Sequence, residues 1–200
     1  MQFYEVSDHL SDPILKVHEW VQEAQNDSVA LPHAMNIATI NPEGKPSSRM
    51  VLLKRISQEG FVFFTDYEGG KGNQILNFSH VALNFWWAKT NKQIRIEGGC
   101  SKVSERENDE YFESRPRGSQ ISASVSHQSS EIESYSSLVK DSENFENQYL
   151  DKEIPRPSRW GGFIVKPSSI EFWIDQSNRL HKRELFLSDG KNWKKTLLSP

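Results

Sequence analysis

Residues 34–64 read AMNIATINPEGKPSSRMVLLKRISQEGFVFF, and this stretch decides the fold. Short apolar runs alternate in it with turn residues, first at Asn41-Pro42-Glu43-Gly44 and again at Gln58-Glu59-Gly60. Such runs, bounded by tight turns, are typical of β-strands that run antiparallel to one another. We therefore predict an antiparallel meander with strands at Met50–Leu53 and Phe61–Phe64.

Upstream of the meander the sequence predicts a helix. Ile14, Val17 and Val21 recur at helical spacing, which places them on one face. Asp12 is a suitable N-cap, and Pro13 suits the first helical turn. We expect the helix to begin at this pair.

Downstream, the strand pattern continues and helices are inserted late. A short helix is expected over residues 71–78, after Gly69 and Gly70. Residues 141–157 should end a helix and continue as a connection interrupted by prolines. Further strands are expected over residues 81–87, 93–102, 160–165, 170–173, 184–187 and 192–197, with a hairpin turn at Ser188-Asp189-Gly190.

Two serines mark further helix starts. Ser104 precedes Glu107 and Ser130 precedes Glu133, the spacing at which the two side chains cap each other's backbone. The serine-rich residues 115–129 between these helices are expected to form a loop. The pattern as a whole predicts an α+β protein with a mainly antiparallel, barrel-like sheet and flanking helices.

The composition fits one folded domain spanning residues 1–200, because a chain of this length can bury a single core. A net charge of −3 gives no general attraction to nucleic acid or anionic membranes, so any phosphate site must be local. The sequence has no basic leader and no apolar run of membrane-spanning length, which predicts a cytoplasmic protein. Cys100 is the single cysteine, so we expect a small buried residue, with no internal disulfide and no metal site.

Three segments could hold a phosphate locally. Arg49–Lys54 is a strand with basic ends, which could bind an anion or carry solvated charges. Lys71 follows two glycines and could serve an anion at a helix N-terminus or lie on the surface. Gln128 and Ser129 precede a predicted helix, where anion binding and plain capping by Ser130 are both open.

The segment YFESRPRGSQ, residues 111–120, runs from a helix into a loop. Tyr111, Arg115 and Ser119 offer a phenol, a guanidinium and a hydroxyl close together in sequence. Such groups can grip a phosphate monoester, because arginine matches its oxygens bidentately and hydroxyls donate further bonds. A charged helix C-terminus is the alternative.

The last cluster follows the aromatic strand at residues 170–173. On an extended segment Arg179, His181 and Arg183 would lie on one face, with two fixed charges around an imidazole. That arrangement favours an anionic or electron-rich ligand. The sequence has no G-x-S-x-G, H-E-x-x-H, G-x-G-x-x-G or P-loop motif, so hydrolase, nicotinamide and nucleoside triphosphate sites have no support.

Taken in order, these clusters resemble the pyridoxine (pyridoxamine) 5′-phosphate oxidase family from about residue 12 to residue 200. The resemblance implies a homodimer of split β-barrels with two FMN molecules at the interface, each held by both subunits. Its most specific pieces are Arg49–Lys54, Tyr111, Ser114-Arg115-Pro116, Ser119, Gln128-Ser129, Trp160-Gly161-Gly162-Phe163, Ile170–Trp173, Arg179-Leu180-His181 and Arg183.

The resemblance also implies residue roles. Arg179 and His181 would be the catalytic residues, lying over the substrate ring near its reacting carbon. The substrate phosphate would contact Lys54, Tyr111, Arg115 and Ser119. FMN would contact Arg49, Met50, Val51, Leu52, Leu53, Lys54, Phe64, Thr65 and Lys71 of one subunit and Gln93, Gln128, Ser129, Trp173 and Arg183 of the other.

The implied reaction oxidises pyridoxine 5′-phosphate or pyridoxamine 5′-phosphate to pyridoxal 5′-phosphate. A hydride would leave the C4′ carbon for flavin N5, and O2 would then reoxidise the flavin and give H2O2. The amine substrate would release ammonia through an imine. The flavin carries the electrons, so the protein supplies placement and charge.

The chain departs from the family pattern in four places. Gly70 stands where an arginine usually precedes the lysine, Arg159 where an aromatic residue is common, and Lys182 where an acidic residue is usual. The chain also begins late, which predicts that it lacks the N-terminal segment that helps to cover the substrate in some members.

Two other functions compete with this one. The related phenazine-biosynthesis flavin oxidase would share the fold and the FMN site but act on a tricyclic substrate. A small barrel that stacks single-stranded nucleic acid on Phe85, Trp86 and Trp87 is the other alternative. The acidic net charge argues against that second alternative.

Overall fold

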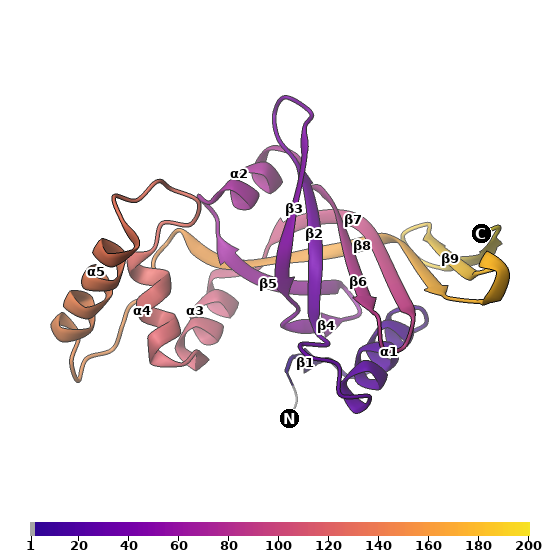
Figure 1. Ribbon diagram of the computed structural model, residues 1–200, viewed down its shortest axis with the longest axis horizontal. Coiled ribbons are helices and arrows are strands. Elements are labelled where there is room, and N and C mark those ends of the chain that lie inside the picture. Colours follow the sequence, from indigo (N-terminus) through magenta and orange to yellow (C-terminus); the bar gives the residue numbers. More distant parts are fainter. Residues whose placement is uncertain (1–2) are drawn as a thin grey trace.

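The structure is a computed structural model that describes residues 3–200. A curled sheet occupies its centre, with helices at both ends of the strands (Figure 1). The helices are α1 (Ile14–Asn26), α2 (Gly70–Asn77), α3 (Glu105–Ser114), α4 (Arg117–Val125) and α5 (Tyr135–Gln148). The strands are β1 (Glu5–Val6), β2 (Ala34–Ile40), β3 (Pro46–Leu52), β4 (Arg55–Ser57), β5 (Gly60–Asp66), β6 (His80–Trp87), β7 (Lys92–Lys102), β8 (Trp160–Ile174), β9 (Lys182–Ser188) and β10 (Trp193–Leu198).

The strands form a single mixed sheet in the order β1-β4-β5-β8-β7-β6-β2-β3, and the β9–β10 hairpin extends it from β8. Only β1 and β4 pair in parallel within the described chain; the other pairs are antiparallel. The predicted antiparallel pairing is therefore confirmed, but the strands of residues 34–66 do not form one continuous meander. In the described chain β3 pairs with β2 at one edge of the sheet, and β4 pairs with β5 towards the other edge. The sheet curls into a split barrel, which also confirms the predicted fold class.

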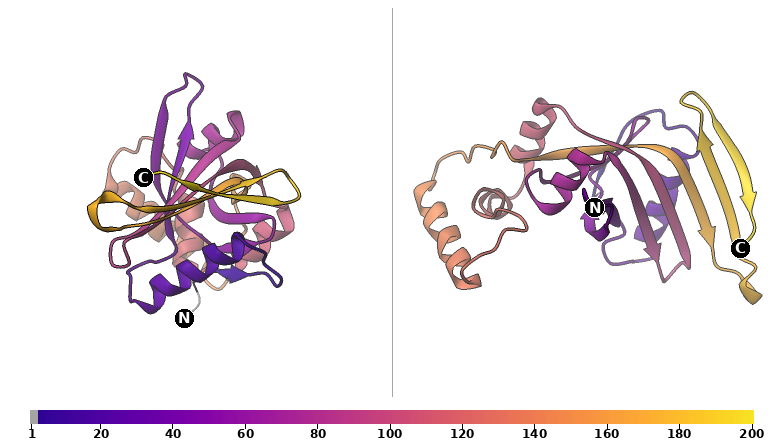
Figure 2. Two further views of the ribbon diagram at one scale, coloured as in Figure 1. Left: turned by 90° about the vertical axis from the view of Figure 1, so that its right-hand side faces the viewer. Right: turned by 90° about the horizontal axis from the view of Figure 1, so that it is seen from above.

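The long strand β8 corrects one prediction. The sequence suggested two strands over residues 160–165 and 170–173, but β8 runs unbroken for 15 residues. The ladder with β7 shifts register between Glu97 and Gly98, and this bulge lies where Pro167 pairs. Because a bulge tolerates a residue that has no N–H to donate, the strand passes through the proline. Figure 2 shows β8, in orange, running from the α3–α5 end to the C-terminal hairpin.

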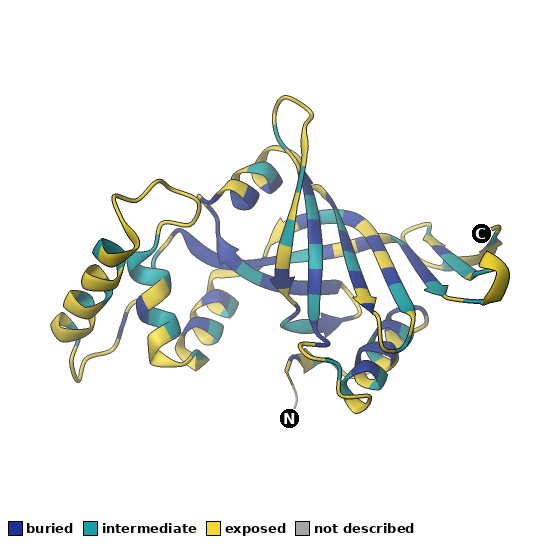
Figure 3. Ribbon diagram, in the orientation of Figure 1, coloured by how far each residue is buried: buried dark blue, intermediate teal, exposed yellow. Residues whose placement is uncertain are grey.

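The main core lies between α1 and the concave face of the sheet. Ile14, Val17 and Val21 are fully buried, as the helical spacing predicted, whereas α5 contains no buried residue (Figure 3). The helix begins differently from the prediction. Pro13 occupies the N-cap position, and no side chain caps the helix. Asp12 lies one residue before the N-cap, so its carboxylate does not accept hydrogen bonds from the free N–H groups of the first turn.

Helices α3 to α5 pack beside the start of β8 and correct two further predictions. Residues 115–129 are not a loop, since they contain α4, whose Ile121 is buried with Phe112 and Trp160. The next helix begins at Tyr135, not after Ser130. Its N-cap is Ser134, which forms a reciprocal capping box with Ser137. Ser104 does cap α3, as predicted, by accepting from the N–H of Glu107 at 3.2 Å.

Several smaller observations complete the fold. Cys100 is buried, as expected, and burial raises the pKa of its thiol to about 12. Phe85 and Trp87 are core residues with 0% and 2% exposure, which removes two of the three rings of the nucleic-acid platform. None of the helices within residues 3–200 is both long and apolar enough to cross a membrane.

Candidate functional site

Two basic side chains meet where β3, β5 and α2 approach one another, and we call them the Arg49–Lys71 pair. Arg49 donates from Nη1 to Thr39 Oγ1 at 2.5 Å and from Nη2 to Ser47 Oγ at 2.6 Å. Lys71 Nζ donates to Thr65 Oγ1 at 3.0 Å and also to Gln128 Oε1. Arg49 also donates to Gln74 Oε1 at 3.2 Å and to the carbonyl oxygen of Ile37 at 3.5 Å, so all six acceptors are neutral oxygens.

The Arg49–Lys71 pair has no carboxylate partner among residues 3–200. Lys71 is only 8% exposed, and its burial, together with the charge of Arg49, lowers its pKa to about 8 despite the opposing effect of Asp66. Burial lowers the pKa of Arg49 as well. These partly desolvated cations form hydrogen bonds only to neutral oxygens, so they can receive an anion from a ligand.

A second set of basic groups lies around a cavity of about 450 Å³ whose lining includes Lys54, Tyr111 and Ser114. Burial and the nearby charge of Arg115 lower the pKa of Lys54. Burial also lowers the pKa of Arg115, whose Nη1 is buried without a hydrogen-bond partner in the described chain. This guanidinium lies over the Trp160 ring, 4.3 Å from its centroid. The predicted Lys54, Tyr111 and Arg115 are thus brought together.

An aromatic stack lies beside the second basic region, because Arg115 lies over its Trp160 ring. The rings of Phe64 and Tyr111 stack with centroids 3.8 Å apart, and Trp160 stacks on Phe64 at 5.5 Å. Burial raises the pKa of Tyr111, so its phenol stays a donor at neutral pH. Phe64 and Thr65, the acceptor of Lys71, are consecutive residues of β5, so their side chains point to opposite faces of the strand.

The start of the described chain lies beside this cavity. Residues 3–6 line it together with Lys54. The N–H of Glu5 donates to the carbonyl oxygen of Lys54 at 2.9 Å, and β1 pairs with β4 next to it. Ser119, the remaining predicted phosphate ligand, is half-buried in the first turn of α4.

The third set of predicted site residues lies on β7, β8 and β9, near the C-terminal end of β8. Gln93, Trp173 and Arg183 are directly opposite one another on β7, β8 and β9, so their side chains share one face. Arg183 Nε donates to the buried carboxylate of Glu171 at 2.7 Å, and this bond raises the arginine pKa. Arg95 Nη1 donates to the same carboxylate at 3.1 Å. The basic groups here are paired.

The expected common face of Arg179, His181 and Arg183 is wrong. Asn178 and Arg179 have φ of 56° and 60°, in a short 3-10 turn that precedes β9. Because the chain is not extended there, alternation does not apply, and Arg179 is exposed at the turn. His181 instead lies 4.6 Å from the Trp173 ring, and its Nδ1 is 3.0 Å from Asp175 Oδ1.

Strand β3 divides the predicted run from Arg49 to Lys54. Val51 and Leu53 are buried in the core, so their side chains are not available to a ligand, and the N–H of Leu53 donates to the carbonyl oxygen of His33 at 2.9 Å. Met50 and Leu52 point to the exposed face, and Lys54 follows the end of the strand.

The position of Gln128 also differs from expectation. The resemblance placed it across the dimer from Lys71, yet the two are in direct contact within one chain. Ser129 lies in the same place, since a Cβ built on Gly70 would be 3.6 Å from its Oγ.

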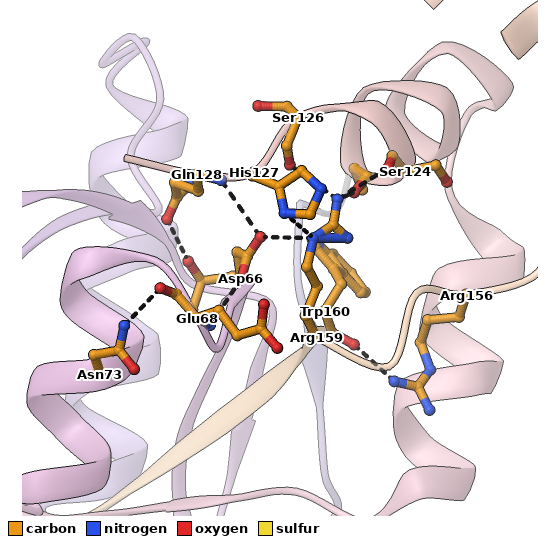
Figure 4. A network of polar contacts seen from close by, with 12 residues as sticks. Asp66, Glu68, Asn73, Ser124, Ser126, His127, Gln128, Arg156, Arg159 and Trp160 are labelled. Carbon is orange, nitrogen blue, oxygen red and sulfur yellow. Dashed lines mark hydrogen bonds and ion pairs between the residues drawn. The ribbon is translucent and has the colours of Figure 1, made fainter. Parts of the chain in front are cut away.

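Sequence reasoning missed several residues of the site. Thr39 and Ser47 are directly opposite each other on β2 and β3, beside Arg49, so the pairing of two hydroxyl residues was the available signal. Asp66 and Arg159 form a buried ion pair, Nε to Oδ2 at 3.4 Å, next to Gln128 (Figure 4). No sequence spacing pointed to that pair, because 93 residues separate its members.

Comparison with solved structures defines the class first. The curled sheet is a split β-barrel, and a pyridoxamine 5'-phosphate oxidase-related, FMN binding protein from Nostoc punctiforme shares the fold. The TM-score is 0.78 over 96% of this chain and 98% of that one, at 13% identity. PhzG from Burkholderia lata 383, solved in complex with tetrahydrophenazine-1-carboxylic acid, has a TM-score of 0.90 and 32% identity, covering 96% and 95% of the two chains.

Sequence comparisons define the family. The family described as pyridoxamine 5'-phosphate oxidase matches residues 21–149, and the pyridoxine 5'-phosphate oxidase C-terminal dimerisation region matches residues 160–200. Proteins named pyridoxine/pyridoxamine 5'-phosphate oxidase from Psychromonas ingrahamii and Trichormus variabilis are 44% and 46% identical over 95% of this chain, and over 88% and 89% of their own lengths. The chain belongs to the pyridoxine/pyridoxamine 5'-phosphate oxidase family and is an oxidoreductase. The family indicates a flavin cofactor, and the C-terminal match supports a homodimer.

Proposed function

We propose that this protein is an FMN-dependent oxidase that converts pyridoxine 5′-phosphate and pyridoxamine 5′-phosphate to pyridoxal 5′-phosphate. One observation carries the proposal. Two separate pairs of partly desolvated cations, Arg49 with Lys71 and Lys54 with Arg115, have no carboxylate partners in the described chain, and Arg115 of the second pair lies on an aromatic stack. A cofactor phosphate and a substrate phosphate would supply one anion for each pair.

The Arg49–Lys71 pair fits the FMN phosphate. Its hydroxyl and amide neighbours, Thr65 and Gln128, can accept from the cations in the free protein and reorient toward phosphate oxygens in the complex. When bound, FMN supplies a two-electron acceptor for the substrate hydride. Gln93, Trp173 and Arg183 of a second copy would complete its site, which is the reason we propose a homodimer with shared sites.

The Lys54–Arg115 pair fits the substrate phosphate. Arg115 Nη1 is a buried donor without an acceptor, and a phosphate oxygen would satisfy it. Tyr111 and Ser119 would add hydroxyl donors. Arg179 would orient the substrate and His181 would support it, and both are brought by the second copy.

The overall reaction balances without a further co-reactant for the alcohol. The C4′ carbon loses a hydride and its hydroxyl loses a proton, which gives the aldehyde, while O2 gains the two electrons and two protons and becomes H2O2. For the amine, the first product is an imine, and water replaces its nitrogen and releases ammonia. The chain contributes by positioning: charged side chains that bind the two phosphates reduce the entropic cost of bringing cofactor and substrate together.

A direct assay tests the proposal. The purified protein should be yellow, with a flavin spectrum, and should form pyridoxal 5′-phosphate and peroxide from pyridoxine 5′-phosphate in air. A colourless protein that FMN fails to reconstitute would contradict the flavin part.

The 32% identity to PhzG keeps a tricyclic substrate as the second candidate. Arg115→Met separates the two substrates. If the substrate carries a phosphate, this variant should raise its KM by about 10-fold or more, the value of a lost charge-assisted bond. A yellow protein that is inert toward both B6 phosphates but oxidises a phenazine precursor would establish the alternative.

A further inference from the structure

Arg159, just before β8, holds the end of helix α4. Its side chain is buried, and Nη2 donates to the carbonyl oxygens of Ala123 at 3.0 Å, Ser124 at 2.9 Å and Ser126 at 3.2 Å. These carbonyls belong to the last turn of α4 and its C-cap, where helix carbonyls lack intrahelical partners. The cation therefore caps α4 at the point where the chain leaves toward Gln128 (Figure 4).

The same guanidinium is tied to the segment that follows α4. Arg159 Nε lies 3.2 Å from His127 Nδ1 and 3.4 Å from Asp66 Oδ2. The other oxygen of Asp66 accepts from the N–H of Glu68 at 2.8 Å, and Oδ2 also accepts from the N–H of Gln128 at 3.4 Å. The backbone of Gln128 is thus bonded to the carboxylate whose charge Arg159 balances.

Gln128 in turn touches the proposed phosphate site. Its Oε1 accepts from Lys71 Nζ and, at 2.9 Å, from Thr65 Oγ1. A Cβ built on Gly69 would lie 3.1 Å from the carbonyl oxygen of Gln128, so the segment is packed closely against the start of α2. A shift of Gln128 would therefore change what surrounds the Lys71 ammonium.

We propose that Arg159 is a positioning residue for the cofactor phosphate: through Asp66 and His127 it fixes Gln128 against Lys71 and so raises the affinity for FMN. The inference rests on the proposed FMN site. The proposed role is one of positioning, because Nε and Nη2 of Arg159 are already used by carbonyl oxygens, Asp66 and His127.

The test measures FMN affinity, not turnover. Apoprotein is titrated into FMN and the dissociation constant is read from the loss of flavin fluorescence, with the melting temperature of each apoprotein recorded alongside. Arg159→Met should raise the dissociation constant at least about tenfold, as expected when an ion pair that orders a ligand contact is lost. Arg159→Lys keeps the charge beside Asp66 and should recover part of that loss.

Arg117→Met is the matched control. Arg117 begins the same helix and likewise donates to carbonyl oxygens, those of Tyr149 and Lys152, but it has no contact with the Gln128 segment. A general loosening of α4 would affect both variants, whereas a positioning role confines the effect to Arg159. We expect Arg117→Met to change the dissociation constant by less than about twofold, as is usual for exposed groups.

A double-mutant cycle with Gln128→Ala identifies the route. If Arg159 acts through Gln128, Arg159→Met should have less than about a twofold further effect in the Gln128→Ala background. Equal effects in both backgrounds, or an unchanged dissociation constant in Arg159→Met, would overturn the inference while leaving the proposed function intact. If Arg159→Met does not fold, Arg159→Lys is judged by the same cycle. Wild-type apoprotein that binds no FMN would instead overturn the proposed function, and this inference with it.

Discussion

Arg49 and Arg183 are both half-buried arginines on strands, yet their surroundings differ in charge. Arg49 donates to the hydroxyls of Thr39 and Ser47, whereas Arg183 donates to the carboxylate of Glu171. A cation that has only neutral partners is costly to desolvate, so binding of an anion at such a site is favourable. A cation already paired with a carboxylate is held in place and adds little net attraction. The contrast indicates which basic groups are available to an anionic ligand and which are held in place by a carboxylate.

Removing a cation from the Arg49–Lys71 pair should have the largest effect on FMN affinity. Arg49→Ala should raise the FMN dissociation constant roughly 10- to 100-fold, because it removes charge-assisted bonds worth about 1.5–3 kcal/mol. The apoprotein should melt no lower than wild type, since no ion pair is lost. Fluorescence titration and thermal melting check the two parts. A lower melting temperature with unchanged FMN affinity would erase the contrast between the regions.

Substituting Arg179 in the exposed turn before β9 should lower the rate of substrate oxidation without changing FMN affinity. Arg179→Ala should lower kcat/KM for pyridoxine 5′-phosphate about tenfold or more by removing an orienting charge. The FMN dissociation constant should stay within about twofold, since Arg179 is assigned to the substrate. Steady-state kinetics with saturating FMN make the measurement. Equal FMN loss in Arg179→Ala and Arg49→Ala would contradict the division of roles.

The pH dependence of FMN binding sharpens the comparison further. The pKa of Lys71 is about 8 in the folded chain, below its ordinary 10.5. As the pH rises, the folded protein therefore loses this proton at a lower pH than an ordinary lysine does. Above pH 8, binding a phosphate dianion then requires proton uptake, and affinity should fall by up to about tenfold per pH unit. Lys71→Met should bind more weakly below pH 8 and show no such fall. A wild-type profile flat from pH 7 to 9.5 would remove Lys71 from the site.

Removing the carboxylate that pairs with Arg95 and Arg183 should cause only a small loss of stability. Glu171→Gln keeps the shape but removes the charge shared by Arg95 and Arg183. Because both arginines are partly exposed, we expect the free energy of unfolding to fall by only about 1 kcal/mol in urea titrations. Glu97→Gln, which removes an exposed pair with Arg95, is the control and should cost less than about 0.5 kcal/mol. Equal losses in the two variants would show that burial of Glu171 does not matter.

Local pattern predicted the antiparallel strands and the helical face of α1, because turn residues and apolar spacing act over a few residues, but it did not predict that β3 and β4 separate to different parts of the sheet. It did not predict α4, whose serines favour a loop; buried Ile121 and the carbonyl bonds of Arg159 stabilise the helix from a distance. The positive φ at Asn178 and Arg179 was equally hidden, since alternation assumes an extended chain. The sequence located the cations of the site, but only the folded chain shows which of them lack a carboxylate.

Strand β8 has a consequence for genetics. Gly161 is opposite Thr65 near one end of β8, and Trp173 is opposite Arg183 near the other, roughly 40 Å further along an extended strand. If each FMN takes one end from each chain, a mixed dimer of an Arg49→Ala chain and an Arg183→Ala chain keeps one undamaged site. Two alleles that are inactive alone should then complement each other when co-expressed, up to half of wild-type activity per dimer.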